Sequence, residues 1–144
     1  MNQLEQVFLN LITNARDAIC EKEGGPQYED GNRDSIEIIT RQSQNDNNLI
    51  EILFKDSGKG IEDSARNSIF DPFFTTKAVG KGTGLGLSIS YGIVHDHNGQ
   101  IDIAETGPQG TTFLVKLPIE QPIINPETIS EETFLETAAQ DVSG

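Results

Sequence analysis

The chain has 144 residues, of which 35% are hydrophobic, and a formal net charge of −13 at pH 7. That length suits one domain, and the acidic excess excludes a nucleic-acid partner, which needs a basic patch, and argues against direct contact with an anionic membrane. A single cysteine excludes a disulfide framework and no apolar run approaches the ~20 residues of a membrane span, so we expect a cytoplasmic segment, even within a membrane-anchored parent protein.

The chain begins with a helical pattern over residues 2–22, which ends at Gly24-Gly25-Pro26. Apolar side chains recur there at steps of three and four residues, so one stripe of the helix is expected to face a core. The stripe consists of Leu4, Val7, Phe8, Leu11, Ile12, Ala15, Ala18 and Ile19.

Polar side chains line the edge of this stripe. Asn10 and Asn14 are four residues apart, so they lie one turn above each other, and Asp17 follows on the same side. The oxygen of an asparagine side chain can bind Mg²⁺, which in proteins usually also contacts water and phosphates. Taken alone, the motif also fits a pair of solvated asparagines on a helix flank.

The rest of the chain alternates strands and turns around a second long helix. The patterns predict strands at 35–41, 49–55, 99–105 and 110–117, a short helix at 62–69, a second amphipathic helix at 84–97 and a loop at 71–82. Residues 119–144 hold six acidic side chains and no Lys or Arg, which predicts a linker or a disordered tail after a domain over residues 1–118.

Asp56 directly follows the second predicted strand. It shares its parity with Ile52 and Phe54, so its carboxyl group is expected to point to the apolar side of the strand. A buried carboxylate needs hydrogen-bond donors, and the exocyclic amine of adenine is a suitable one. Gly58 and Gly60 leave room for a flat base. An ordinary Asp-Gly turn is the alternative for this motif alone.

A glycine-rich run, Gly80-Lys81-Gly82-Thr83-Gly84-Leu85-Gly86, leads into the second helix. Glycines let the backbone approach an anion, and the helix N-terminus adds a partial positive charge, so the run is a candidate cradle for phosphates. The spacing is not that of a P-loop, because Lys81 is not followed by Ser or Thr. It is not a Rossmann fingerprint either, because its last three glycines alternate.

Two further motifs are candidates for contacts with a ligand. The loop before the glycine-rich run holds Phe70, Phe73 and Phe74. These side chains predict either the anchors of a lid over a nucleotide or a hydrophobic cluster under a long loop. Thr111, in the last strand, shares its parity with Phe113, so its hydroxyl group faces the core side and could meet adenine directly or through water. An ordinary strand threonine is the alternative.

Taken together and in this order, the motifs resemble the ATP-binding catalytic domain of sensor histidine kinases. The matching segments are 6–15 (N box), 56–60 (G1 box), 70–77 (F box), 82–86 (G2 box) and 110–111 (third glycine motif). The resemblance covers about residues 3–118. The F box contains Phe-Phe-Thr-Thr-Lys, a form most similar to that of nitrogen-regulation-type sensor kinases. The resemblance implies the Bergerat fold, a two-layer α/β sandwich in which helices pack on one face of a mixed β-sheet.

The resemblance also implies ATP and Mg²⁺ as ligands. Asn14 would hold Mg²⁺, Asn10 would support the phosphates and Asp56 would read adenine, while Lys77 would reach the γ-phosphate when the lid closes. Asn10, Asn14 and Lys77 are the expected catalytic residues. The other positions expected to line the nucleotide are Asp17, Gly58, Gly60, Ile61, Phe70, Thr76, Gly82, Thr83, Gly84, Leu85, Gly86 and Thr111.

Asn10 helps to choose the reaction. In the hydrolytic members of the same superfamily, the position four residues before the magnesium asparagine is a glutamate that activates water. Asn10 occupies that position here and cannot act as a general base. The resemblance therefore implies transfer of the γ-phosphoryl group to a protein imidazole, for which the domain positions ATP and screens charge. A nucleotide-binding module without catalysis and a Bergerat ATPase are the alternatives.

The accepting imidazole is expected on a partner. The family places a strand or two, and a helical hairpin with the phospho-accepting histidine, before the first helix, whereas this chain opens at that helix. We therefore expect an N-terminally truncated domain whose partner is a dimerisation hairpin, in the same parent protein or separate, with a response regulator downstream. His95 and His97, at the end of the second helix, are expected to be packing or capping residues.

Overall fold

The computed structural model describes residues 2–29, 31, 33–74 and 85–120. Within them the chain order is α1 (Gln3–Cys20), β1 (Ile36–Gln42), β2 (Leu49–Asp56), α2 (Asp63–Arg66), α3 (Gly86–Asp96), β3 (Gln100–Gly107) and β4 (Gly110–Pro118). The described residues leave out most of the predicted lid and the glycine-rich run as far as Gly84. They also leave out the predicted tail beyond Glu120. Among the described residues, every helix is too short or too polar to span a membrane.

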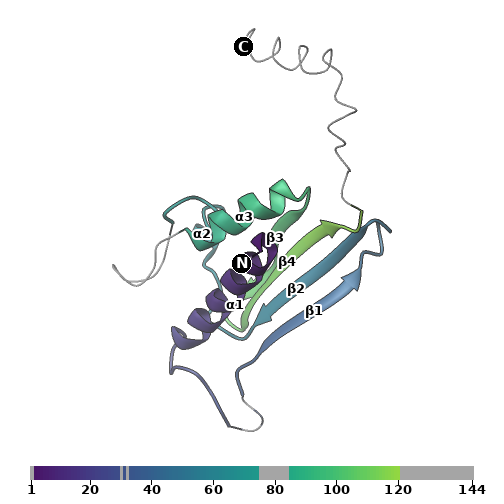
Figure 1. Ribbon diagram of the computed structural model, residues 1–144. Helices are drawn as coiled ribbons and strands as arrows, with labels where there is room; N and C mark the ends of the chain where they lie inside the picture. Colours follow the sequence, from purple (N-terminus) through teal and green to yellow (C-terminus); the bar gives the residue numbers. More distant parts are fainter. Residues whose placement is uncertain (1, 30, 32, 75–84, 121–144) are drawn as a thin grey trace, which may run out of the picture.

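The strands form one sheet in the order β1-β2-β4-β3 (Figure 1). The expected two-layer α/β sandwich is confirmed, but the sheet is antiparallel throughout its described strands instead of mixed. The reason is topological: β2 and β3 run in the same direction, and β4 lies between them and pairs with both. The same arrangement brings the C-terminal end of β2 and the turn of the β3–β4 hairpin together at one end of the sheet.

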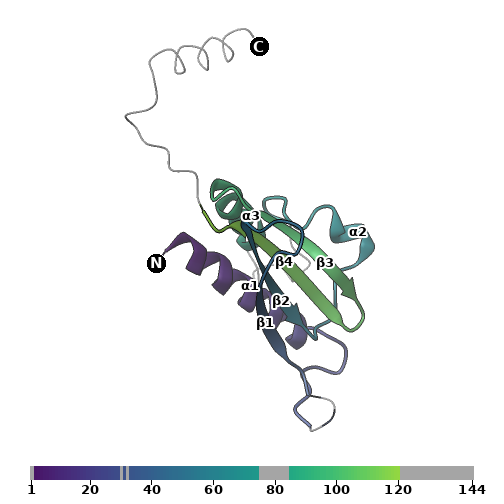
Figure 2. The same ribbon diagram turned by 90° about the vertical axis from the view of Figure 1, so that its right-hand side faces the viewer.

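Two helices cover one face of the sheet, as Figures 1 and 2 show for α1 and α3. The predicted apolar stripe of α1 faces the sheet, and its buried residues are Val7, Leu11, Ala15 and Ile19. Opposite them, Phe54 of β2 and its cross-strand partner Phe113 of β4 are 2% and 6% exposed. Burying an apolar side chain of this size stabilises a fold by roughly 1.5–3 kcal/mol, so this interface between the layers holds the domain together.

Local hydrogen bonds set the ends of the helices. Asn2 Oδ1 accepts a bond of 2.8 Å from Leu4 N and caps the start of α1. α2 covers only part of the helix predicted at 62–69, because a tighter turn follows it, closed by a 2.9 Å bond from Ser68 N to Ala65 O.

The end of α3 confirms a capping role for one of the two histidines. His97 is the C-cap residue, and its Nδ1 lies 2.8 Å from Ile93 O. Asn98 then takes a left-handed φ of 60°, and Gly99 N donates to Val94 O at 2.9 Å. These features together form the Schellman motif that commonly ends helices. His95, by contrast, is exposed and its ring stacks on the ring of Tyr91.

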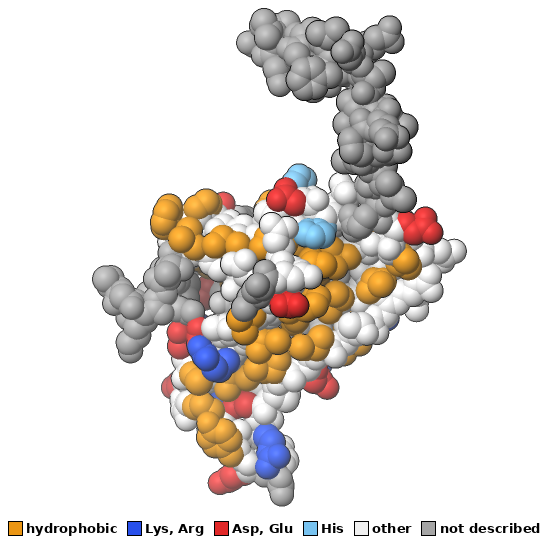
Figure 3. All heavy atoms as spheres, in the orientation of Figure 1, with side chains coloured by type: hydrophobic (Ala, Val, Ile, Leu, Met, Phe, Trp, Pro, Cys, Tyr) orange, Lys and Arg blue, Asp and Glu red, His pale blue; other side chains and the backbone are white. Residues whose placement is uncertain are grey.

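Hydrophobic side chains also reach the surface on the face drawn in Figure 3. β1 is an edge strand, and all of its residues are exposed, including Ile38 at 50%. Because β1 contributes so little to the core, the core centres on β2 and β4. The candidate site is built at the ends of these two strands.

Candidate nucleotide-binding site

Asp56 lies at the end of β2 and is only 6% exposed. Its Oδ1 accepts hydrogen bonds from the backbone amides of Gly58 at 2.8 Å and Thr111 at 3.3 Å. Both bonds end on Oδ1, so the second carboxylate oxygen, Oδ2, is not committed to either amide. The predicted burial of this side chain is confirmed. A buried carboxylate oriented by the backbone in this way can accept a further donor from a ligand.

The environment of Asp56 also perturbs its proton affinity. Burial raises the pKa of the Asp56 carboxyl group above its ordinary value, while the two backbone hydrogen bonds oppose the rise. The ionised form is therefore held at a cost that a donor from a ligand would offset. A buried carboxyl group with a perturbed pKa is a common feature of functional sites.

The turn after Asp56 packs directly on α1. A Cβ atom at Gly58 would lie 2.5 Å from Ala18 Cβ, so only glycine allows this close approach. Lys59 N donates to Ala18 O at 3.1 Å, and Lys59 Nζ pairs with Glu21 Oε2 at 2.8 Å. The last turn of α1 and the turn after β2 therefore form one wall.

Asn14 lies one helical turn before Ala18, on the same flank of α1, at a separation of about 6 Å along the axis. Its Nδ2 atom is buried and has no hydrogen-bond partner among the described residues. Buried polar atoms are nearly always satisfied, so an amide of this kind is typical of a side chain that meets a ligand. An amide can present either oxygen or nitrogen, and its oxygen is a suitable ligand for Mg²⁺. Asn14 could therefore supply one ligand of a Mg²⁺ site through its Oδ1 atom.

Asn10 connects this flank to the start of α3. Its Nδ2 donates to Gly86 O and to Ser90 Oγ, both at 3.2 Å, and Ser90 is fully buried. Within the part of the chain that the structure describes, no side-chain hydrogen bond caps the start of α3 at its N-cap residue, Leu85. The first amides of such a helix are suitable donors to an anion. The flank of α1 therefore runs from the Asp56 turn, past Asn14, to a potential phosphate site.

Thr111 and Thr106 close the site from the β3–β4 hairpin. Thr111 is buried as predicted, and its Oγ1 lies 2.9 Å from Thr106 Oγ1. Thr106 Oγ1 in turn accepts a 2.9 Å bond from Ile61 N. Gly60 lies against Gly107, where a Cβ atom would come within 2.0 Å of the carbonyl oxygen. The hairpin thus fixes the turn that follows Asp56.

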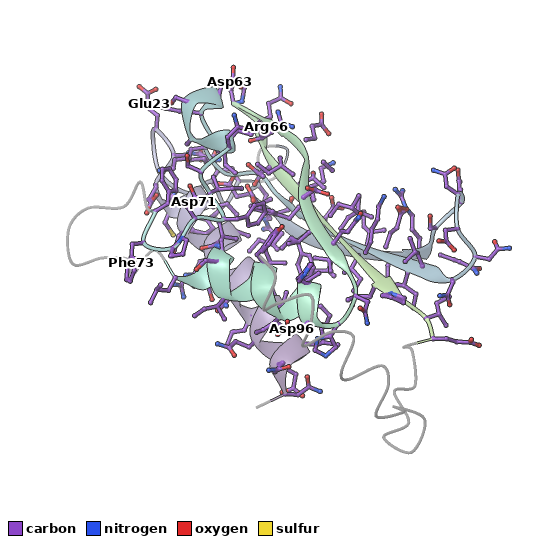
Figure 4. The ribbon with its side chains drawn as sticks, turned by 90° about the horizontal axis from the view of Figure 1, so that it is seen from above. Glu23, Asp63, Arg66, Asp71, Phe73 and Asp96 are labelled. Atoms are coloured by element: carbon purple, nitrogen blue, oxygen red, sulfur yellow. The ribbon has the colours of Figure 1, made fainter. Side chains whose placement is uncertain are left out.

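The phenylalanines of the predicted lid divide into two groups. Phe70 packs between Tyr91 and Phe113, with ring centroids 5.4 and 6.4 Å apart, and Phe74 packs against the core. Phe73 is 73% exposed, has a φ of 66° and points away from the domain (Figure 4). Phe70 and Phe74 therefore pack on the core, which fits both the lid anchors and the hydrophobic cluster considered above, whereas Phe73 makes no such contact with the described residues.

Other expected positions differ in what the structure says of them. Asp17 lies on the flank of α1 and is paired with Arg16 at 3.0 Å. Thr76, Lys77, Gly82, Thr83 and Gly84 lie outside the described residues. Their assignment to the lid and to the phosphates stays a prediction.

Thr106 is a residue of the site that the sequence interpretation missed. Its cross-strand pairing with Thr111 follows from the turn between Gly107 and Gly110. The register of that hairpin is the signal that could have found it.

The chain matches the family described as "Histidine kinase-, DNA gyrase B-, and HSP90-like ATPase" over residues 1–121. It is 41% identical over 121 residues to the two-component sensor PprA of Pseudomonas aeruginosa, an alignment that covers 84% of this chain and 12% of PprA. It is 42% identical over 116 residues to the signal transduction histidine-protein kinase AtoS of Escherichia coli, covering 81% of this chain and 17% of AtoS. The chain thus spans less than a fifth of the length of these relatives.

Solved structures agree with the sequence relatives. The nucleotide-free catalytic domain of histidine kinase ThkA superposes with a TM-score of 0.61 at 32% identity, over 81% of this chain and 66% of that one. A full-length structure of ShkA in complex with AMPPNP gives a TM-score of 0.64 at 22% identity, which shows the shared fold.

The sandwich and its buried aspartate match what is expected of an ATP-binding domain. The chain belongs to the histidine kinase-, DNA gyrase B- and HSP90-like ATPase family, and within it to the ATP-binding catalytic domains of two-component histidine kinases.

Proposed function

We propose that this domain binds Mg-ATP between α1, α3 and the Asp56 turn and transfers the γ-phosphoryl group to a histidine on a dimerisation hairpin. The hairpin is a partner in the same parent protein or a separate chain, and the phosphoryl group passes from it to a response regulator. We place the domain at residues 1–118, before an acidic tail, and on the cytoplasmic side of any membrane. The nitrogen-regulation type remains our preferred subtype.

The observation that carries this proposal is the continuity of one wall. Gly58 lies against Ala18, and Asn14 lies one turn further along the same flank of α1. A base bound at Asp56 would therefore have its phosphates directed past Asn14 toward the start of α3. One nucleotide could then contact motifs that are far apart in the sequence.

Different residues of the chain would bind the base and the phosphates. Asp56 Oδ2 would accept from the amine of adenine, while Gly58 and Thr111 hold the carboxylate in place. The amides of Leu85 and Gly86, and those of Gly82 to Gly84, would donate to the phosphates, and Lys77 would reach the γ-phosphate. Mg²⁺ held by Asn14 would neutralise charge on the phosphates when bound.

Asn10 supports transfer over hydrolysis. Its amide nitrogen is occupied by Gly86 O and Ser90 Oγ. An amide has no basic lone pair with which to activate water, so this position offers no general base. The sequence relatives named as kinases support the same choice.

One assay separates the proposal from its alternatives. The chain is mixed with γ-labelled ATP, Mg²⁺ and a separate histidine hairpin from a related kinase. We expect label on the hairpin. Binding without transfer would instead indicate a nucleotide-binding module, and release of free phosphate alone would indicate an ATPase.

A further inference from the structure

A group of polar side chains that the nucleotide site does not use lies behind the Asp56 turn. At its centre is Asp34, in the loop between α1 and β1, with a side chain only 8% exposed. Asp34 Oδ1 accepts from Lys22 Nζ and, at 2.8 Å, from Ser57 Oγ, while Oδ2 accepts from the backbone amide of Gln27. Loop carboxylates are usually solvated, so three donors on one carboxylate indicate a built structure. We call this group the Asp34 clasp.

Ser57 joins the clasp to the candidate site. Its Oγ donates to Asp34 and accepts a 2.9 Å bond from Ser35 N, and its own amide donates to Ser35 O at 3.2 Å. Ser57 stands between Asp56, which faces the base site, and Gly58, whose amide orients the Asp56 carboxylate. The direction of that carboxylate therefore depends on how Ser57 is held.

The charge of Asp34 strengthens the clasp. The hydrogen bond from Lys22, followed by that from the Gln27 amide, holds the pKa of Asp34 below its ordinary value, and desolvation opposes them only in part. Asp34 is thus ionised at neutral pH. Hydrogen bonds to an ionised acceptor are stronger and more directional than those between neutral groups.

We propose that Asp34 is a positioning residue for nucleotide binding, which clasps the α1–β1 loop to Ser57 and so holds Asp56 in the orientation that reads the base. The inference rests on the proposed function, because it places the base at Asp56. Among the described residues Asp34 makes no hydrogen bond to Asp56, so its effect on that carboxylate passes through Ser57. Loss of the clasp should therefore weaken recognition of the base and leave recognition of the phosphates unchanged.

Two ligands separate these effects in Asp34→Asn and Ser57→Ala variants. Affinities for ADP and for inorganic tripolyphosphate, both with Mg²⁺, are measured by calorimetry. We expect ADP to bind roughly 2- to 150-fold more weakly, the range that corresponds to coupling between residues in one hydrogen-bond network. Tripolyphosphate should bind as it does to the wild type. Ser57→Thr, which keeps the hydroxyl group, should restore ADP binding.

A matched control is the ion pair between Arg41 and Glu51, at 3.0 Å, on the face of the sheet that does not carry the helices. Glu51→Gln removes an ion pair of similar kind and should change neither affinity.

Wild-type ADP affinity in Asp34→Asn and Ser57→Ala would overturn the inference, and so would an equal loss for ADP and tripolyphosphate. If Asp34→Asn does not fold, the Ser57→Ala and Ser57→Thr pair decides. A folded wild-type domain that binds no ADP would contradict the proposed function instead.

Discussion

At the scale of single residues, we expect Asp56 to contribute to nucleotide binding but not to the stability of the free domain. Its Oδ1 is used by Gly58 N and Thr111 N, so an asparagine in its place must keep its oxygen there and turn its NH₂ group toward the base. A donor would then face the amine of adenine. We expect Asp56→Asn to weaken ADP binding roughly 10- to 100-fold, since hydrogen bonds to charged groups contribute about 1.5–3 kcal/mol.

The same substitution should not destabilise the free domain. Because the pKa of Asp56 is raised in the folded state, stability falls as the pH rises from the ordinary value of 3.8 through the raised pKa, and the loss is then constant. The neutral amide avoids this loss at pH 7. Urea unfolding of Asp56→Asn without nucleotide should give a free energy equal to the wild type or higher. A large decrease would contradict the role of Asp56 as a binding residue held at a cost.

Titration of Asp56 provides a pH test. The carboxylate must be ionised to accept from adenine, so the affinity for ADP should fall on acidification through a pH range above that of an ordinary aspartate. The ¹³C resonance of the Asp56 carboxyl carbon reports this midpoint without interference from phosphate ionisation. A midpoint at or below 3.8 in the free protein would refute the argument.

Asp34 shows the opposite behaviour. Its lowered pKa means that its contribution to stability is fully present above the ordinary value and is lost only as the pH falls through the lowered one. On acidification the base site should therefore lose its charge before the Asp34 clasp opens.

At the scale of elements, the link between α1 and α3 should matter for phosphates. Ser90→Ala removes a buried hydroxyl group that accepts from Asn10 and donates to Gly86 O at 2.8 Å. We expect it to lower the free energy of unfolding by about 1 kcal/mol and to weaken tripolyphosphate binding, because one of the two hydrogen bonds that Asn10 donates to α3 is lost.

Ser88→Ala is the matched control on the same helix. Within the described residues the Ser88 hydroxyl bonds only to Leu85 O, at 3.0 Å, and makes no hydrogen bond to α1. Its loss should affect tripolyphosphate binding less than Ser90→Ala does. Equal effects of the two variants would argue that the α1–α3 link has no role in the phosphate site.

At the scale of the whole molecule, periodicity in the sequence predicts the elements but not their arrangement. The stripe of α1 and the burial of Asp56 and Thr111 follow from local spacing, and both are found. The antiparallel order does not follow from it, because it depends on where the chain crosses to the far edge of the sheet.

The same limit explains the residues that were missed or misjudged. The contact of Asp34 with Ser57 joins positions 23 residues apart, and nothing in a polar loop marks such a contact beforehand. Its apolar side chain predicts that Phe73 docks, but Phe73 has a left-handed backbone and is 73% exposed. Local patterns therefore locate candidate side chains, whereas their supporting contacts come from the fold.

The central claim is that one nucleotide contacts both Asp56 and Asn14. Titration of the ¹⁵N-labelled domain with a non-hydrolysable ATP analogue and Mg²⁺, followed by NMR, tests it most directly. We predict that the Gly58 and Thr111 amides, the Asn14 side-chain amide and the Gly86 amide all shift with one dissociation constant. Separate dissociation constants for Gly58 and Asn14, or no response at one of them, would contradict the claim.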